Sequence, residues 1–188
     1  SGTNLFVSGL AQYRLHETVL REHADDELAH YSKRCHDVEY KFPMGWSELE
    51  GIANRADFDL TQHSKISGKE LNYLDTKTNE RFVPYVIEPS GGVDRAVLAF
   101  LVDAYKKEIV NERERVYLSL DKRLAPIKIA VLPLLKKNGD IVEMSHKLRQ
   151  ELGGRYRVVY DDTAAIGRLY RRQDEIGTPY CVTVDVDS

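Results

Sequence analysis

The stretch Glu88-Pro89-Ser90-Gly91-Gly92-Val93-Asp94-Arg95 decides how the first part of the chain is interpreted. We predict a strand over residues 82–87 with an edge or bulge position at Pro84, a turn of Pro-Ser-Gly-Gly, and a helix over residues 93–107. Glycines let backbone approach a ligand closely, and a helix start offers unpaired N–H groups to an anion. Arg95 lies in the first turn, where the helix dipole disfavours a cation unless an anion is bound. An anion site and an ordinary helix start with a surface ion pair both remain open.

Upstream of this stretch the residue pattern changes from helical to alternating. Leu15, Val19, Leu20 and Leu28 are spaced as in a helix between residues 11 and 30, which predicts one surface helix or a broken pair. Alternation then predicts two strands, over residues 37–43 and 47–55. The second strand would carry Leu49 on one face and both Glu48 and Glu50 on the other. Residues 61–80 are polar and are predicted to form a surface excursion or hairpin.

Downstream, a linker over residues 112–115 should enter a short strand over residues 116–120. The pattern then alternates between apolar strands and amphipathic helices, which implies a mainly parallel sheet covered on both faces. The expected strands span residues 127–135, 156–160 and 180–186, and the expected helices span residues 141–152 and 163–175. We therefore place one domain at residues 1–121 and a second at residues 122–188. Because the second ends on a strand, we expect it to be truncated at its C-terminus.

Composition is that of an ordinary globular protein, with 42% hydrophobic and 30% charged residues. Residues 1–121 carry 15 Lys and Arg against 21 Asp and Glu, whereas residues 122–188 carry 12 against 9. The net positive charge of residues 122–188 favours a nucleic-acid contact there. An ordinary solvated surface would explain the same charge equally well. No apolar run reaches the roughly 20 residues of a membrane span, so we expect a cytoplasmic protein without membrane contact.

The cysteines and histidines show no spacing typical of a metal site or a nucleophilic triad. Cys35 and Cys181 belong to no Cys-x-x-Cys pair, so free buried thiols are expected rather than a zinc site or a disulfide. The six histidines lack an HExxH context and are interpreted as surface or packing residues.

The sequence of residues 88–95 resembles motif 3 of the class II aminoacyl-tRNA synthetases. It is most similar to the version of this motif found in the homodimeric type of glycyl-tRNA synthetase. Further segments resemble the same family in the same order, and the resemblance runs from about residue 25 to the end. They are residues 26–32 (DELAHYS), 45–55 (GWSELEGIANR), 57–60 (DFDL), 124–126 (LAP), 166–168 (IGR) and 174–179 (DEIGTP). This resemblance implies an α+β antiparallel-sheet catalytic core of the class II synthetases, followed by an α/β anticodon-binding domain with a mainly parallel sheet.

The resemblance also implies roles for individual residues. Arg95 would bind the terminal phosphate of ATP, and together with Glu88 it would be the catalytic pair. The remaining ATP contacts would come from Glu48, Leu49, Gly92, Val93 and Asp94. Glycine would be bound by Arg55, Glu88, Pro89, Ser90, Gly91 and Gly92, with the Glu88 carboxylate on its ammonium group. Glu48 would act through Mg²⁺, unless Glu48 and Glu50 are simply a solvent-facing pair.

The implied reaction is ATP-dependent activation of glycine to glycyl-adenylate and transfer to tRNA(Gly) by a homodimer. Basic side chains of the second domain would contact tRNA phosphates, or would form an ordinary charged helix face. These are Arg168, Arg171 and Arg172, with Arg155, Arg157 and Lys128 beside them.

The chain lacks three features of the family pattern. It contains no F-R-x-E pattern of motif 2, no motif 1, and no upstream acidic segment. We therefore expect an incomplete, inactive fragment of a glycine–tRNA ligase. A non-catalytic tRNA-binding protein derived from a synthetase and a regulatory nucleotide-binding module remain the alternatives.

Overall fold

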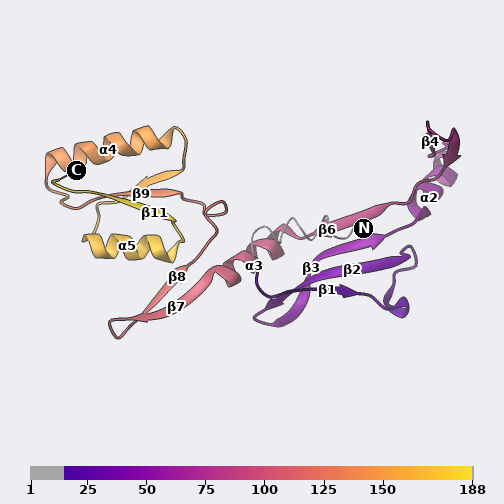
Figure 1. Ribbon diagram of the computed structural model, residues 1–188, viewed down its shortest axis with the longest axis horizontal. Helices are drawn as coiled ribbons and strands as arrows, with labels where there is room; N and C mark the ends of the chain where they lie inside the picture. Colours follow the sequence, from indigo (N-terminus) through magenta and orange to yellow (C-terminus); the bar gives the residue numbers. More distant parts are fainter. Residues whose placement is uncertain (1–14, 188) are drawn as a thin grey trace. The chain divides into compact units, whose positions relative to one another are not determined.

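The computed structural model describes residues 15–187, which fall into two compact units (Figure 1). The first unit ends at Ala99 and the second begins at Phe100. Neither contains a helix long and apolar enough to cross a membrane, as far as the described residues extend.

The first unit is built on a four-stranded antiparallel sheet in the order β1-β2-β3-β6. The strands span Thr18–Glu22 (β1), Arg34–Phe42 (β2), Gly45–Asn54 (β3) and Ile87–Gly91 (β6). The two strands predicted over residues 37–43 and 47–55 are confirmed as β2 and β3. One face of β2 is apolar, because Val38, Tyr40 and Phe42 are each at most 5% exposed. Burial of such side chains is the main driving force for forming the sheet.

A bulge in β3 corrects the prediction that Glu48 and Glu50 share a face. Val38 of β2 pairs with Glu50, but the next residue, Glu39, pairs with Glu48, so Leu49 is the additional residue in β3. An extra residue reverses the alternation of side chains. Glu48 therefore lies on the polar face of the sheet, whereas Glu50 lies beside Gly91 on the other face. Burial raises the pKa of Glu50, and the Leu49 side chain is buried.

Two further predictions in this unit are wrong. The helix expected between residues 11 and 30 is replaced in its described part by β1 and a short 3₁₀ helix, η1 (Asp25–Glu27), because residues 18–22 pair with β2; residues 11–14 lie outside the described range. The strand predicted over residues 82–87 is interrupted between Phe82 and Ile87, where Pro84 cannot donate a ladder hydrogen bond.

The turn predicted at Pro89-Ser90-Gly91 is also wrong, because these residues belong to β6. Pro89 pairs with Ile52 of β3. A proline is tolerated there because β6 is the last strand of the described sheet, so its outer side needs no donor.

The rest of the first unit consists of a helix, a hairpin and the start of a second helix. Helix α2 (Phe58–Ser67) was not predicted, whereas the hairpin expected within residues 61–80 is found as β4 (Tyr73–Asp75) and β5 (Glu80–Phe82). Helix α3 (Val93–Ala104) begins where predicted but ends earlier. Residues 105–107, expected to be helical, pair instead with residues 116–118.

The second unit opens with the end of α3, which the hairpin of β7 (Tyr105–Val110) and β8 (Arg113–Leu118) follows. Asn111 and Glu112 form its two-residue loop, and both have positive φ, which matches the twist of the flanking strands. Residues 112–115, expected to be a linker, are therefore turn and strand. Because β8 packs on the last helix of the second unit, the compact unit begins before the predicted boundary at residue 122. The functional domain boundaries stay a prediction.

A three-stranded parallel sheet in the order β10-β9-β11 completes the second unit. The strands span Ile129–Pro133 (β9), Val158–Tyr160 (β10) and Tyr180–Val184 (β11), and the helices span Gly139–Gly153 (α4) and Ile166–Glu175 (α5). Figure 1 shows α4 and α5 on opposite sides of this sheet. Ala130 and Leu132 pack towards Leu169 of α5, and Val131 packs towards Ile141 of α4. The predicted parallel sheet with two covered faces is confirmed.

Gly177→Ala should destabilise the second unit. Gly177 has φ +73°, and an added Cβ would lie 2.8 Å from Leu120 Cδ1 and 3.1 Å from the Leu118 carbonyl oxygen. We expect a loss of about 2 to 3 kcal/mol in the free energy of unfolding, from backbone strain and overpacking together. Urea denaturation followed by circular dichroism measures the change. Gly167→Ala is the matched control, because an added Cβ there meets nothing within 4 Å. Equal midpoints for the two variants would contradict this account.

Candidate functional site

The polar face of the first sheet arranges predicted site residues in rows across neighbouring strands. Cys35 of β2 pairs with Ala53 of β3, which pairs with Glu88 of β6. In the next row, Asp37 pairs with Gly51, and Gly51 pairs with Ser90. Paired residues in adjacent strands point to the same face of the sheet. The structure therefore brings Glu88 and Ser90, both predicted to bind glycine, onto one face with Asp37.

Small residues at the centre of this face leave room for a cavity of about 280 Å³. A Cβ placed on Gly51 would lie 3.4 Å from Glu48 Oε1 and 3.6 Å from both Asp37 Oδ1 and Ser90 Oγ. Three polar side chains therefore converge above a residue that has none. The cavity is lined by His23, Glu27, Ala29, Tyr31, Ser32, Cys35, Asp37, Glu48, Gly51, Ala53, Glu88 and Ser90. Its charged lining is mostly carboxylate, which suits a small cation or ammonium group.

Arg55 is held at this site by two carboxylates and an aromatic ring. Its Nη1 donates to Glu88 Oε2 at 2.6 Å, and its Nε and Nη2 donate to Asp59 at 2.5 and 2.9 Å. Its guanidinium also lies over the Tyr31 ring, 4.0 Å from the centroid. The hydrogen bonds that Arg55 donates to Asp59 and Glu88 raise the pKa of Arg55. Arg55 is thus a fixed cation that takes up part of the negative charge of Glu88 and orients it.

Arg95 and Glu48, both predicted to contact ATP, lie together. From the first turn of α3, Arg95 Nη1 donates to the Ser47 hydroxyl at 3.2 Å and to the Glu48 carbonyl oxygen. The guanidinium is exposed and reaches the β3 bulge that turns the Glu48 side chain towards the cavity. Such an exposed arginine beside a helix start is a suitable phosphate ligand.

The other predicted ATP and glycine contacts differ in accessibility. Gly91, Gly92, Val93 and Asp94 are exposed around the start of α3, and Pro89 is exposed on β6. Leu49 is only 2% exposed, so its side chain is not available to a ligand.

The same cavity contains a group of three potential metal ligands that no spacing in the sequence indicates. Potential ligand atoms of His23, Cys35 and Asp37 all lie within 4.8 Å of one another, and this is the only such group in the described part of the chain. Burial raises the pKa of the Cys35 thiol, and the carboxylates of Asp37, Glu48 and Glu88 raise it further. Glu48, predicted to bind Mg²⁺, is not a member of this group.

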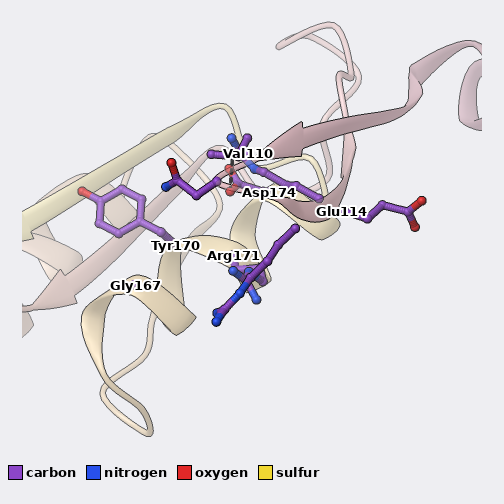
Figure 2. A pocket seen from close by; sticks show the side chains of 9 residues that line it. Val110, Glu114, Gly167, Tyr170, Arg171 and Asp174 are labelled. Atoms are coloured by element: carbon purple, nitrogen blue, oxygen red, sulfur yellow. Dashed lines mark hydrogen bonds and ion pairs between the residues drawn. The ribbon is translucent and has the colours of Figure 1, made fainter.

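A second hollow lies in the second unit, between the β7–β8 hairpin and α5 (Figure 2). Gly167, Tyr170, Arg171 and Asp174 line it from one face of α5, and Val110 with neighbouring hairpin residues lines the opposite side. The hairpin residues are Val110, Asn111, Arg113, Glu114 and Arg115. Arg115 joins the two sides, because it donates to Asp174 at 2.6 Å and to Glu108 at 2.8 Å. This groove was not predicted from the sequence, because residues 112–115 were expected to form a linker and instead form part of the hairpin.

The predicted tRNA-binding side chains are not equally available. Arg168 and Arg171 are exposed on α5. Arg172 is already engaged by Asp161 at 2.9 Å and Thr163 at 2.7 Å, and the Lys128 ammonium donates to the carbonyl oxygens of residues 122 and 123. Arg155 and Arg157 are exposed next to β10. Arg171 combines exposure with a place in the groove.

Comparison with known proteins finds relatives that span residues of both units. Residues 128–188 match the family described as Anticodon binding domain. The chain is 55% identical over 170 residues to the glycine–tRNA ligase of Alkaliphilus oremlandii, which is 90% of this chain and 36% of that protein. It is 55% identical over 177 residues to the glycine–tRNA ligase of Thermobifida fusca, which is 90% of this chain and 38% of that protein. The chain thus spans a little over a third of these curated relatives, and the resemblance inferred from its motifs is confirmed.

Among solved structures, the Giardia lamblia prolyl-tRNA synthetase in complex with prolyl-adenylate is similar in fold. The TM-score is 0.63 at 16% identity, covering 96% of this chain and 36% of that chain. The predicted fold class, an antiparallel class II core followed by an α/β anticodon-binding domain, is therefore confirmed.

The pKa of Asp59 should show whether Arg55 donates hydrogen bonds to its carboxylate. Hydrogen bonds from Arg55 keep the pKa of Asp59 below its ordinary value of 3.8, so this pairing stabilises the fold above pH 3.8 and is lost as the pH falls through the lower native pKa. In Arg55→Gln, we expect the Asp59 pKa to rise towards 3.8, measured from carboxyl chemical shifts. Asp121, whose low pKa depends on Arg123, is the internal control. An unchanged Asp59 pKa would show that Arg55 is not its main partner.

Proposed function

We propose that this chain, a relative of the glycine–tRNA ligases over nine tenths of its length, contributes to the ATP-dependent charging of tRNA(Gly) with glycine. The observation that carries the proposal is the meeting of Asp37, Glu48 and Ser90 around Gly51, in a cavity that Glu88 also lines. Arg95 is bound to the β3 bulge at Glu48. This arrangement supports a small ammonium-binding cavity next to a phosphate-binding arginine.

Glycine would enter the cavity with its ammonium group towards the carboxylates. Glu88 provides a partly buried carboxylate that Arg55 orients at 2.6 Å, and Ser90 provides a hydroxyl across from Gly51. The atoms around Gly51 are polar, since Glu48, Asp37 and Ser90 all lie within 3.6 Å of a Cβ placed there. An amino acid with an apolar side chain would find no apolar partners beside them, which favours glycine.

ATP would bind with its terminal phosphate on Arg95, at the start of α3. Its exposed guanidinium can exchange the Ser47 and Glu48 oxygens for phosphate oxygens. The exposed backbone at Gly92, Val93 and Asp94 supports close approach of the nucleotide. Glu48 fits a role in holding Mg²⁺, because this ion is commonly bound through one or two carboxylates and substrate phosphates. When bound, Mg²⁺ would supply charge neutralisation on the phosphates.

The proposed chemistry requires placement and charge neutralisation rather than a protein nucleophile. The glycine carboxylate oxygen forms a bond to the α-phosphorus of ATP, and the bond from that phosphorus to the pyrophosphate leaving group breaks. Glycyl-adenylate then transfers its glycyl group to a terminal hydroxyl of the tRNA, releasing AMP. Glu88 and Ser90 would hold glycine, while Arg95 would offset negative charge on the departing pyrophosphate.

The second unit would bind tRNA(Gly). Its match to the anticodon-binding family covers residues 128–188, and exposed arginines line or flank the groove beside α5. Arg171 and Arg168 are the primary candidates for phosphate contacts, with Arg155 and Arg157 further along the unit. We place the activity in the cytoplasm, as for translation generally, and expect a homodimer.

Arg95→Ala should impair the use of ATP. We expect glycine-dependent exchange of pyrophosphate into ATP, measured on the complete gene product, to fall on the order of a hundredfold with a raised KM for ATP. Arg81→Ala is the control, because that exposed arginine bonds to Asn72 on the β4–β5 hairpin. Normal ATP dependence in the Arg95 variant would refute its role. Absence of exchange in the unmodified protein with retained tRNA binding would favour a non-catalytic tRNA-binding protein.

Arg171→Ala should weaken binding of a tRNA(Gly) transcript by this chain. We expect the slope of log affinity against log salt concentration to decrease in magnitude by about 1, corresponding to one lost phosphate contact. Fluorescence anisotropy at several salt concentrations measures this slope. Arg172→Ala should change it less, because Asp161 and Thr163 already engage that guanidinium. An unchanged slope for Arg171→Ala would remove the groove from the tRNA interface.

A further inference from the structure

We propose that His23, Cys35 and Asp37 form a binding site for a thiolate-preferring divalent metal ion of the Zn²⁺ type. The three residues come from two adjacent strands and their continuation. Cys35 and Asp37 are two apart on β2, so their side chains share a face. The His23 amide donates to the Cys35 carbonyl at 3.0 Å, which continues the β1–β2 ladder and places the histidine opposite the cysteine.

The side-chain geometry is close to that of a tetrahedral site. His23 Nε2 lies 2.7 Å from Asp37 Oδ2, and Cys35 Sγ lies 4.0 Å from Asp37 Oδ1. Bonds of about 2.0 to 2.3 Å to a tetrahedral metal imply ligand separations of about 3.3 to 3.8 Å. Small rotations about the side-chain bonds therefore suffice to place a metal between the three donors. No change in strand register is required.

The chemical identity of the donors selects the type of metal. Thiolate and imidazole together favour zinc and similar ions over magnesium or calcium, which prefer an all-oxygen set. The His23 and Asp37 side chains are 20% and 11% exposed, so the donors are sheltered but open to the cavity. Three protein ligands leave a fourth position for water or for a carboxylate of the same cavity, such as Glu48 or Glu88.

A metal at this position would lie in the cavity proposed for glycine and would compete with its ammonium group. This consequence rests on the proposed function, whereas metal binding itself does not. If saturating glycine leaves the metal affinity unchanged, the competition is excluded and the metal site stands.

The test uses Co²⁺ as a spectroscopic probe of the full chain. Binding at the proposed site should produce thiolate-to-cobalt charge-transfer absorption in the near ultraviolet, which Zn²⁺ abolishes by displacement. Cys35→Ser should lose this absorption and weaken Co²⁺ binding at least about tenfold. Cys181→Ser is the matched control and should retain both, because Cys181 packs against the apolar core beside α5. His23→Gln should weaken binding while leaving a thiolate band.

Absence of charge-transfer absorption in the unmodified chain, or its loss in Cys181→Ser and not in Cys35→Ser, would overturn the proposal. A second measurement avoids substitutions altogether. Zn²⁺ should slow alkylation of Cys35 by iodoacetamide, read by peptide mass spectrometry, and should leave alkylation of Cys181 unchanged. Equal rates for Cys35 with and without Zn²⁺ would also overturn the site.

Discussion

The antiparallel pairing of β3 with β2 on one side and β6 on the other is the constraint on which the first unit depends. It sets Ser90 opposite Gly51 and Glu88 opposite Ala53, and it continues the same rows to Asp37 and Cys35. A shift of one residue in this register would turn every one of these side chains to the opposite face. The apolar face of β2 opposes such a shift, because it would move Val38, Tyr40 and Phe42 from burial into water.

The same face must accommodate several carboxylates close together. Like charges in a partly buried cavity repel one another and disfavour ionisation, so nearby cations have a structural as well as a chemical role. Arg55 supplies one of them to Glu88 and Asp59, and Tyr31 supports its guanidinium by stacking. Arg95 approaches from α3 to the backbone at Glu48. A bound ammonium group or metal ion would supplement these cations within the cavity itself.

The two sides of α5 have different surroundings in the second unit. Leu169 and Gln173 are buried against the sheet side, whereas Gly167, Tyr170, Arg171 and Asp174 line the groove facing the β7–β8 hairpin. The Arg115–Asp174 pair fixes this hairpin to the helix. The groove is therefore formed by α5, which packs on the buried core, and by a hairpin that is bonded to α5. Such rigid support favours a preformed binding surface.

Sequence alone revealed the resemblance to the glycine–tRNA ligases and the fold class. It also predicted most elements of the second unit, because long apolar strands and amphipathic helices have distinct periods. It also identified Glu88, Ser90, Glu48, Arg55 and Arg95 as site candidates, but it treated residues 89–91 as a turn and placed Glu48 and Glu50 together. Only the tertiary structure decided those points, since the pairing of β6 and the β3 bulge depend on strands distant in sequence. The convergence of His23 with Cys35 and Asp37 was hidden for the same reason. The spacing of ligands along a chain reveals a metal site only where all the ligands lie on the same helix, strand or loop. Here Cys35 and Asp37 lie on β2, and His23 reaches them only because β1 pairs with β2.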